Sequence, residues 1–239
     1  MSTTALRPPT TTFLASPNSV AQAIACFDQD VLLSFGLLGK RTFAENYERA
    51  WGRILIDSGA YSELSSGKSI DLDEYAEFAN RWSSRAVAIA GLDDISGDYR
   101  RSLRNYERVG FPTYHDTDPP AILKDLIDIS RERGGWLGVG IKPPRHNKEE
   151  WLARTLASIP DDIHVHGWAL RLYRNTHPRF DSFDSTNWWR DSFKLKALPP
   201  LEHLTDKELL DIVVKRYERE ERMVRSVNQK EEQQRCLGI

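Results

Sequence analysis

Short apolar runs rich in β-branched residues alternate along the chain with segments whose apolar residues recur every three or four positions. The first pattern is typical of buried parallel strands, and the second of helices with one apolar face. Their alternation predicts a series of βα units built around a parallel sheet. Seven strands are expected, over residues 31–38, 53–57, 86–92, 111–114, 136–141, 163–166 and 180–184.

The helical segments carry their own start signals. Asp71 with Glu74 three residues later is the pattern of a helix N-terminus, and the apolar stripe that follows ends at Trp82. An eighth strand has one remaining candidate, residues 193–198. We therefore expect the α/β class, a TIM-type (β/α)8 barrel that is incomplete or irregular if that strand is absent, with a long C-terminal helix.

Three parts are expected along the chain. Residues 1–17 are rich in Thr, Pro and Ser and lack the apolar region of a signal peptide, which predicts a flexible N-terminal arm. Residues 18–202 hold the barrel. Residues 203–239 begin with the capping pair Thr205 and Glu208 and predict a charged helix that packs on the barrel or extends from it.

Composition narrows the function classes. The chain lacks an uncharged apolar segment of about 20 residues, so no membrane span is expected. We expect a cytoplasmic location. The formal net charge of −2 does not by itself indicate nucleic-acid binding, which must rest on local patches. Cys26 and Cys236 lie near opposite ends and belong to no Cys-x-x-Cys pattern, so neither a disulfide framework nor a thiolate zinc site is expected.

Polar residues at the ends of the apolar runs are the first candidates for chemistry, because parallel barrels carry their sites at the carboxyl ends of the strands. Any one aspartate there is better explained as a helix N-cap, so the chemical interpretation depends on the convergence of several. A lone inward histidine is more often a satisfied core group than a metal ligand. The candidates are Asp57, Asp93, Asp94, His115, Gly138, Gly140, His164, His166, Asp181 and Asp184.

Six of these positions lie in four motifs that resemble those of tRNA-guanine transglycosylases, in the same order. Asp57-Ser58-Gly59-Ala60-Tyr61 is similar to the family's Asp-Ser-Gly-Gly-aromatic motif. Leu92-Asp93-Asp94 resembles its third-strand aspartate, Leu137-Gly138-Val139-Gly140 its glycine-rich base-binding strand, and Phe183-Asp184-Ser185 its nucleophile motif. The ordered set spans about residues 50 to 190.

Further details resemble the phage and bacterial relatives that place 7-deazaguanine derivatives in DNA. These are His115, the segment His164-Val165-His166-Gly167, and the segment from Asp184 to Trp188. The tRNA branch carries a Cys-x-Cys-x-x-Cys and His zinc site, which this chain lacks. The resemblance therefore implies an enzyme with DNA and a 7-deazaguanine base as partners, and no metal or other cofactor.

The resemblance also implies roles for individual residues. Asp184 would be the nucleophile, with Asp181 left open in its place, and Asp57 would move a proton between the departing and incoming bases. Asp93 would accept hydrogen bonds from the donor edge of a guanine-like base. The remaining residues expected to bind substrate are Ser58, Gly59, Tyr61, His115, Gly138, Val139, Gly140, His166 and Trp168, with Trp188 as a further candidate for stacking.

A base inside duplex DNA reaches such a pocket only when it is flipped out or locally single-stranded, and the backbone then needs cations. The expected backbone contacts are Lys142, Arg145, Lys148, Arg171, Arg174 and Arg190. Other interpretations stay open: the same chemistry on tRNA, a nucleoside or nucleotide N-glycosidase, or a non-catalytic nucleic-acid-binding partner subunit.

Overall fold

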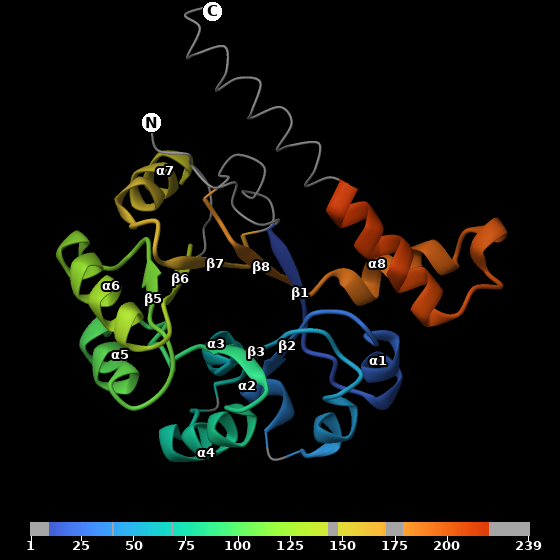
Figure 1. Ribbon diagram of the computed structural model, residues 1–239, viewed down its shortest axis with the longest axis horizontal. Helices are drawn as coiled ribbons and strands as arrows, with labels where there is room; N and C mark the ends of the chain where they lie inside the picture. Colours follow the sequence, from blue (N-terminus) through green and yellow to red (C-terminus); the bar gives the residue numbers. More distant parts are fainter. Residues whose placement is uncertain (1–9, 40, 68, 143–147, 171–178, 220–239) are drawn as a thin grey trace, which may run out of the picture.

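Eight parallel strands form the centre of the protein, in a computed structural model that describes residues 10–39, 41–67, 69–142, 148–170 and 179–219. The view in Figure 1 looks into the ring of strands, with the helices outside it. The strands are β1 (Thr11–Ala15), β2 (Val31–Ser34), β3 (Ile54–Asp57), β4 (Ala86–Ile89), β5 (Thr113–His115), β6 (Trp136–Gly140), β7 (His164–Trp168) and β8 (Ser182–Ser185).

The strand order is that of a TIM-like (β/α)8 arrangement with incomplete closure. Neighbours follow the order β4-β3-β2-β1-β8-β7-β6-β5, and every pairing is parallel. The two edge strands, β4 and β5, meet only near Ala90 and Phe111, where the Phe111 N–H donates to the Ile89 carbonyl at 2.7 Å. The expected barrel with an irregular closure is therefore confirmed.

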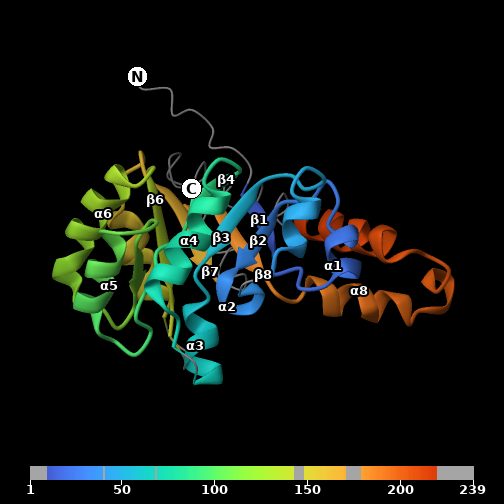
Figure 2. The ribbon, with the colours of Figure 1, turned by 90° about the horizontal axis from the view of Figure 1, so that it is seen from below.

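Helices follow most strands, and all but α3, which projects away from the ring in Figure 2, lie outside the ring and pack against it (Figures 1 and 2). They are α1 (Val20–Ala25), α2 (Phe35–Leu38), α3 (Ala60–Ser66), α4 (Leu72–Trp82), α5 (Tyr99–Tyr106), α6 (Leu123–Glu132), α7 (Glu149–Ser158) and α8 (Trp188–Lys196), with 3-10 turns at Phe43–Tyr47, Pro120–Ile122 and Pro199–Leu201. The expected start of α4 is confirmed, because the Asp71 side chain accepts from the Asp73 and Glu74 N–H groups.

Apolar side chains fill both sides of the sheet, as the unbroken apolar runs predicted. Phe13, Leu55 and Phe111, all 0% exposed, belong to the cluster contributed by alternate residues of the strands, which fills the barrel. Their neighbours along the strands point outward and pack under the helices. The strand residues between them that face outward are therefore covered by helices, as in a barrel with a packed interior.

The prediction of a flexible arm over residues 1–17 was wrong at β1. This strand lies between β8 and β2, with Phe13 opposite Asp184 and Leu14 opposite Val31. Its apolar run is short and begins with threonines, so its pattern did not stand out. The β-branched and aromatic content of Thr11–Ala15, bounded by Pro17, was the available signal.

Two other strand assignments need correction. Residues 193–198, the candidate for the eighth strand, lie mostly in α8, and β1 completes the set of eight instead. The strand expected over residues 31–38 stops at Ser34, and Phe35–Leu38 is a short helix. Gly36 there packs against Gly59, since a Cβ at position 36 would lie 3.0 Å from the Gly59 Cα.

Residues 206–219 form a helix that lies beside α8 (Figure 1). The capping pair forms as expected, because the Thr205 N–H donates to Glu208 Oε2 at 2.8 Å and the Glu208 N–H to Thr205 Oγ1 at 3.3 Å. Leu209, Leu210 and Tyr217 are buried against the barrel, and the Tyr217 hydroxyl donates to Asp191 of α8.

None of the helices in the described part of the chain is long and apolar enough to span a membrane.

The turn from β3 into α3 requires glycine at position 59, which has φ +82°. A Cβ there would lie 2.5 Å from both the Cα and the N of Gly36. We expect Gly59→Ala to lower the free energy of unfolding by roughly 3 kcal/mol or more, from the left-handed backbone and a clash that no side-chain rotation relieves.

Gly67, at the other end of α3, is the matched control for urea unfolding. It has φ +67° with open space around its Cα, so Gly67→Ala meets only the backbone cost of about 1–2 kcal/mol. Equal losses for the two variants would contradict the close packing of Gly36 on Gly59.

Candidate active site

A cavity of about 610 Å³ opens at the carboxyl ends of the strands. Residues that end or directly follow all eight strands line it, and they combine apolar surface with convergent polar groups, as in small-molecule sites. The polar and aromatic lining residues are Ser16, Ser34, Asp57, Tyr61, Ser62, Asp93, Thr113, His115, Lys142, Trp168, Asp184 and Thr186.

Three carboxylates from different strands meet in this cavity. Asp57 ends β3, Asp93 follows β4, and Asp184 lies in β8. Their charges act on one another, because Asp93 and Asp184 both raise the pKa of Asp57 by repulsion. The convergence that the sequence required of these three aspartates is therefore present in the structure.

Asp57 is the carboxylate whose protonation changes near neutral pH. Burial raises its pKa to about 6, against hydrogen bonds from the Gly59 backbone and the Ser34 side chain that favour the ionised form. A carboxyl group with such a pKa exchanges protons readily near neutral pH, which suits a general acid and base.

Asp93 is held by a histidine that is itself held by a second aspartate. His115 Nε2 lies 3.2 Å from Asp93 Oδ2, and the His115 backbone N–H donates to Asp118 Oδ2 at 2.8 Å. Burial raises the pKa of Asp93, and the charges of His115 and Lys142 oppose that rise. Asp118 was missed in the sequence because Asp-Pro-Pro reads as a turn.

Asp184 is fixed by the backbone after β7. The Ala169 N–H donates to Asp184 Oδ1 at 2.6 Å, and Ala169 adopts φ +50°, a conformation that is uncommon for a residue other than glycine. Such local strain is often found at functional sites. Asp184 is only 9% exposed, so the cavity presents it as a shielded carboxylate.

His166, predicted to bind substrate, lies behind the cavity wall instead of on it. Its side chain is 0% exposed, its Nδ1 is 2.8 Å from Ser182 Oγ, and its Nε2 is 3.8 Å from Asp184 Oδ1. Burial lowers the pKa of His166 to about 3, so the ring is neutral at physiological pH. The ring lies beside Asp184, the candidate nucleophile, behind the cavity wall, and therefore cannot contact a ligand in the cavity.

The glycines of β6 make room for side chains of neighbouring strands. A Cβ at Gly138 would lie 2.2 Å from Trp168 Nε1, and one at Gly140 would lie 2.9 Å from His115 Cδ2. Of the three residues predicted here, only Gly140 lines the cavity, whereas Gly138 lies under the Trp168 ring and Val139 points into the helix layer.

Other predicted binding residues divide between the wall and the interior. Tyr61 lines the cavity and is 58% exposed, and Trp168 lines it with its indole N–H donating to Thr113 Oγ1 at 3.1 Å. Ser58 is buried and Gly59 serves the turn, so neither lines the cavity. Trp188 is core, with its indole N–H bonded to the Ala15 carbonyl.

Three of the six cations predicted to bind the DNA backbone lie within the described residues. Lys142 lines the cavity, Lys148 forms an ion pair with Asp116 at 3.0 Å, and the exposed Arg190 on α8 donates to Asn187. Arg145, Arg171 and Arg174 lie outside the described residues.

Asp181 and Asp184, the two candidates for the nucleophile, lie at different ends of β8. Asp181 precedes β8, at the opposite end of the strand from the cavity, where its Oδ2 accepts from the Val165 N–H and from Arg179. Asp184 lines the cavity. Across the described ranges, no three His, Cys, Asp or Glu side chains are placed to share a metal ion.

Comparisons of the chain with known protein families, with curated proteins and with solved structures find no match. The function therefore has to be inferred from the chemistry of the cavity.

Proposed function

We propose that this protein is a DNA-guanine transglycosylase-like enzyme, which exchanges guanine in DNA for a 7-deazaguanine derivative such as 7-cyano-7-deazaguanine. The observation that carries the proposal is the meeting of Asp57, Asp93 and Asp184 in one cavity, each in a different environment. Carboxylates in distinct environments can take distinct roles in one reaction.

Asp184 attacks C1′ of the nucleotide in the first step. The bond from C1′ to the guanine nitrogen breaks, a bond from C1′ to an Asp184 oxygen forms, and Asp57 gives its proton to the departing guanine. Positive charge that develops on the sugar is stabilised by the surrounding carboxylates.

The second step reverses the first with a different base. The incoming 7-deazaguanine gives a proton to Asp57, its ring nitrogen bonds to C1′, and Asp184 leaves as a carboxylate. Two displacements at one carbon retain the configuration, and no cofactor takes part. The pKa of Asp57, about 6, suits a group that both gives and takes a proton.

Asp93 recognises the base in this proposal. Its carboxylate has lone pairs beyond the one directed at His115, and these accept hydrogen bonds from the ring N–H and exocyclic amine of a guanine-type base. The exposed ring of Tyr61 offers a stacking surface at the cavity wall. A cavity of about 610 Å³ is within the usual range for small-molecule sites.

The proposal carries with it a cytoplasmic reaction, in a bacterial or phage-infected cell, on a flipped-out or single-stranded nucleotide. Its most general test needs no knowledge of the incoming base. Labelled guanine is incubated with the protein and unlabelled guanine-containing DNA, and label is measured in the recovered DNA. Incorporation is expected, with none into DNA that lacks guanine. Release of guanine without incorporation would favour an N-glycosidase, and absence of both would count against the proposal.

A further inference from the structure

Arginines gather on α5, the helix that follows the cavity residues Asp93 and Ile95 along the chain. Arg101 is paired with Asp94 at 3.2 Å, and Arg108, just beyond the helix, is paired with Asp73. Arg100 and Arg104 are exposed, and neither forms an ion pair with any residue that the structure describes. Asp94 and Asp73 are thus already paired with Arg101 and Arg108, and the guanidinium groups of Arg100 and Arg104 remain available to a ligand.

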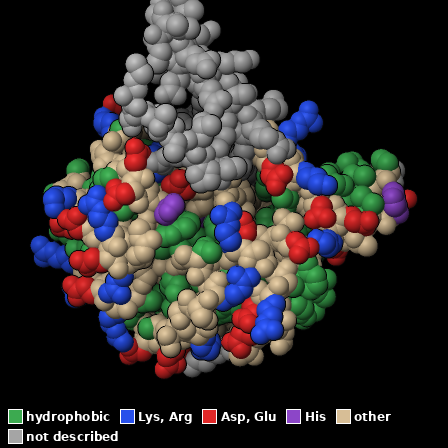
Figure 3. Space-filling model, viewed as in Figure 1, with side chains coloured by type: hydrophobic (Ala, Val, Ile, Leu, Met, Phe, Trp, Pro, Cys, Tyr) green, Lys and Arg blue, Asp and Glu red, His purple; other side chains and the backbone are tan. Residues whose placement is uncertain are grey.

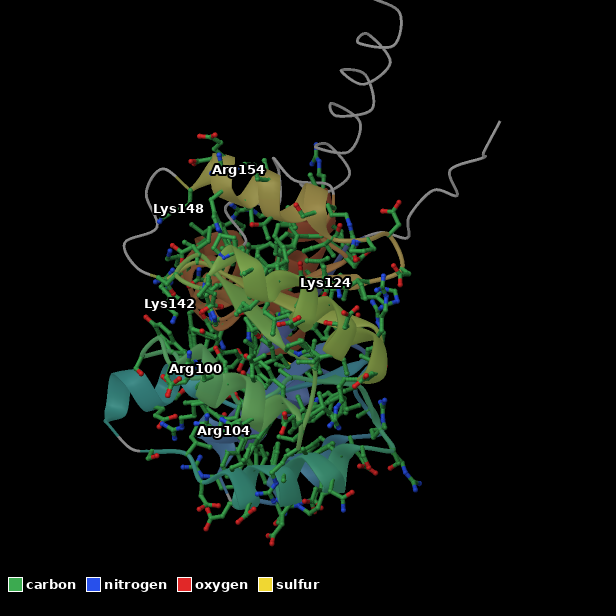
Figure 4. The ribbon with its side chains drawn as sticks, turned by 90° about the vertical axis from the view of Figure 1, so that its left-hand side faces the viewer. Arg100, Arg104, Lys124, Lys142, Lys148 and Arg154 are labelled. Carbon is green, nitrogen blue, oxygen red and sulfur yellow. The ribbon has the colours of Figure 1, made fainter. Side chains whose placement is uncertain are left out.

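These two charges share one face of the helix and lead toward the cavity. Residues four apart lie on the same side of a helix, about 6 Å apart along its axis. Figure 4 shows Lys148, Lys142, Arg100 and Arg104 following one another along one side of the molecule. Lys142 lines the cavity itself, so the row continues from the mouth onto the outer surface of α5.

The other two cations labelled in Figure 4 differ in their surroundings. Lys124 on α6 is 2.8 Å from Asp128, and Arg154 on α7 is 2.6 Å from Glu150, each four residues away on its own helix. Their charges are compensated locally. On the face shown in Figure 3, acidic and basic side chains are interspersed without a large area of one sign.

A cavity with three carboxylates repels a phosphodiester backbone, so a nucleic acid that enters it needs cations at the rim. Arginine suits this role because its planar guanidinium binds phosphate in a bidentate manner. The guanidinium of Arg100 also lies 5.9 Å from the centre of the Tyr99 ring, which limits its freedom before any ligand binds.

We infer that Arg100 and Arg104, continued by Lys142, form a track for the phosphate backbone of the nucleic-acid strand whose nucleotide enters the cavity. The inference rests on the proposed function for its choice of ligand, and it assigns the path that this strand takes across the protein. The partner is a polyanionic DNA strand, bound through its backbone without regard to sequence.

Binding is measured by fluorescence anisotropy with a labelled guanine-containing oligonucleotide, in an Asp184→Asn background and without added base, so that no turnover occurs. We expect Arg100→Gln with Arg104→Gln to weaken binding roughly tenfold or more near 0.1 M salt. The slope of log affinity against log salt should fall by about 1.4 for a single strand, since two phosphate contacts are lost.

The matched control is Lys124→Gln with Arg154→Gln, which removes the same charge from paired positions and should bind like its parent. Equal weakening in both double variants, or none in either, would overturn the track. Label exchange by the wild-type enzyme, measured separately, distinguishes the two proposals. If the wild type exchanges label but the Arg100 and Arg104 variant binds DNA normally, the track alone is contradicted. If that variant selectively loses binding but the wild type exchanges no label, the proposed function alone is contradicted.

Discussion

Asp184→Asn is expected to abolish base exchange while leaving DNA binding intact. An amide cannot act as the nucleophile, so the turnover rate should fall on the order of 10³-fold or more. The fold should survive, because the amide oxygen can still accept the Ala169 N–H that now bonds to Asp184 Oδ1. Turnover is followed by label exchange, and the covalent protein–DNA species by denaturing electrophoresis.

Asp181→Asn is the matched control for this experiment. Asp181 carries the same functional group three residues earlier, but it lies at the far end of β8 and pairs with Arg179 at 3.1 Å. We expect that variant to keep its turnover rate and to lose some stability. Loss of turnover in Asp181→Asn with activity retained in Asp184→Asn would reverse the assignment of the nucleophile.

Asp57→Asn is expected to slow both half-reactions, because the amide neither gives nor takes a proton. General acid or base catalysis typically contributes a factor of about 10² to 10⁴. In the wild type, the rates of the two half-reactions should depend on pH in opposite directions. Departure of guanine needs protonated Asp57 and slows as pH rises through about 6, and attack by the incoming base needs the carboxylate and slows as pH falls through about 6.

Single-turnover rates of the two half-reactions, measured between pH 5 and 8, check this assignment. Both limbs should disappear in Asp57→Asn, and Ser34→Ala should shift them to higher pH, because the Ser34 side chain favours the ionised form. A wild-type profile with the same limb in both half-reactions would contradict the role of Asp57 as the shared proton carrier.

Asp57→Asn should also stabilise the folded state. Burial raises the pKa of Asp57 from its ordinary value near 4 to about 6, so the folded state binds the proton more tightly than the unfolded state. The resulting penalty on wild-type stability grows between about pH 4 and 6 and then stays constant, at up to about 3 kcal/mol. Asp57→Asn should therefore gain most above pH 6 and little near pH 4, as measured by urea unfolding. A gain independent of pH would contradict this cause.

Much of the barrel could be predicted from the sequence because its strands are covered on both sides and read as apolar runs. β3 and β6 lie within the expected segments, and the aspartates that end or follow strands reach one cavity. β1 escaped because only part of its five residues are apolar. The cavity also depends on which strand is neighbour to which, and this follows once the order of a parallel barrel is assumed.

Side-chain contacts that form only in the folded protein could not be predicted from the sequence pattern. Nothing along the chain distinguishes a histidine that lines a cavity from one beneath it, so His115 and His166 received the same role although only His115 lines the cavity. Gly138 resembled a base-binding glycine, yet it accommodates Trp168 from 30 positions later. Asp118 was passed over because its contact with His115 exists only in the folded turn.

The most direct test of the account is mass spectrometry of nucleosides from DNA and, in parallel, from tRNA, each incubated with the protein and 7-cyano-7-deazaguanine. A deazaguanine deoxynucleoside is expected in the DNA digest with the wild type and not with Asp184→Asn. A modified nucleoside in tRNA alone would move the reaction to tRNA. Unmodified DNA and tRNA, from a folded protein that binds DNA, would contradict base exchange and favour a non-catalytic nucleic-acid-binding subunit.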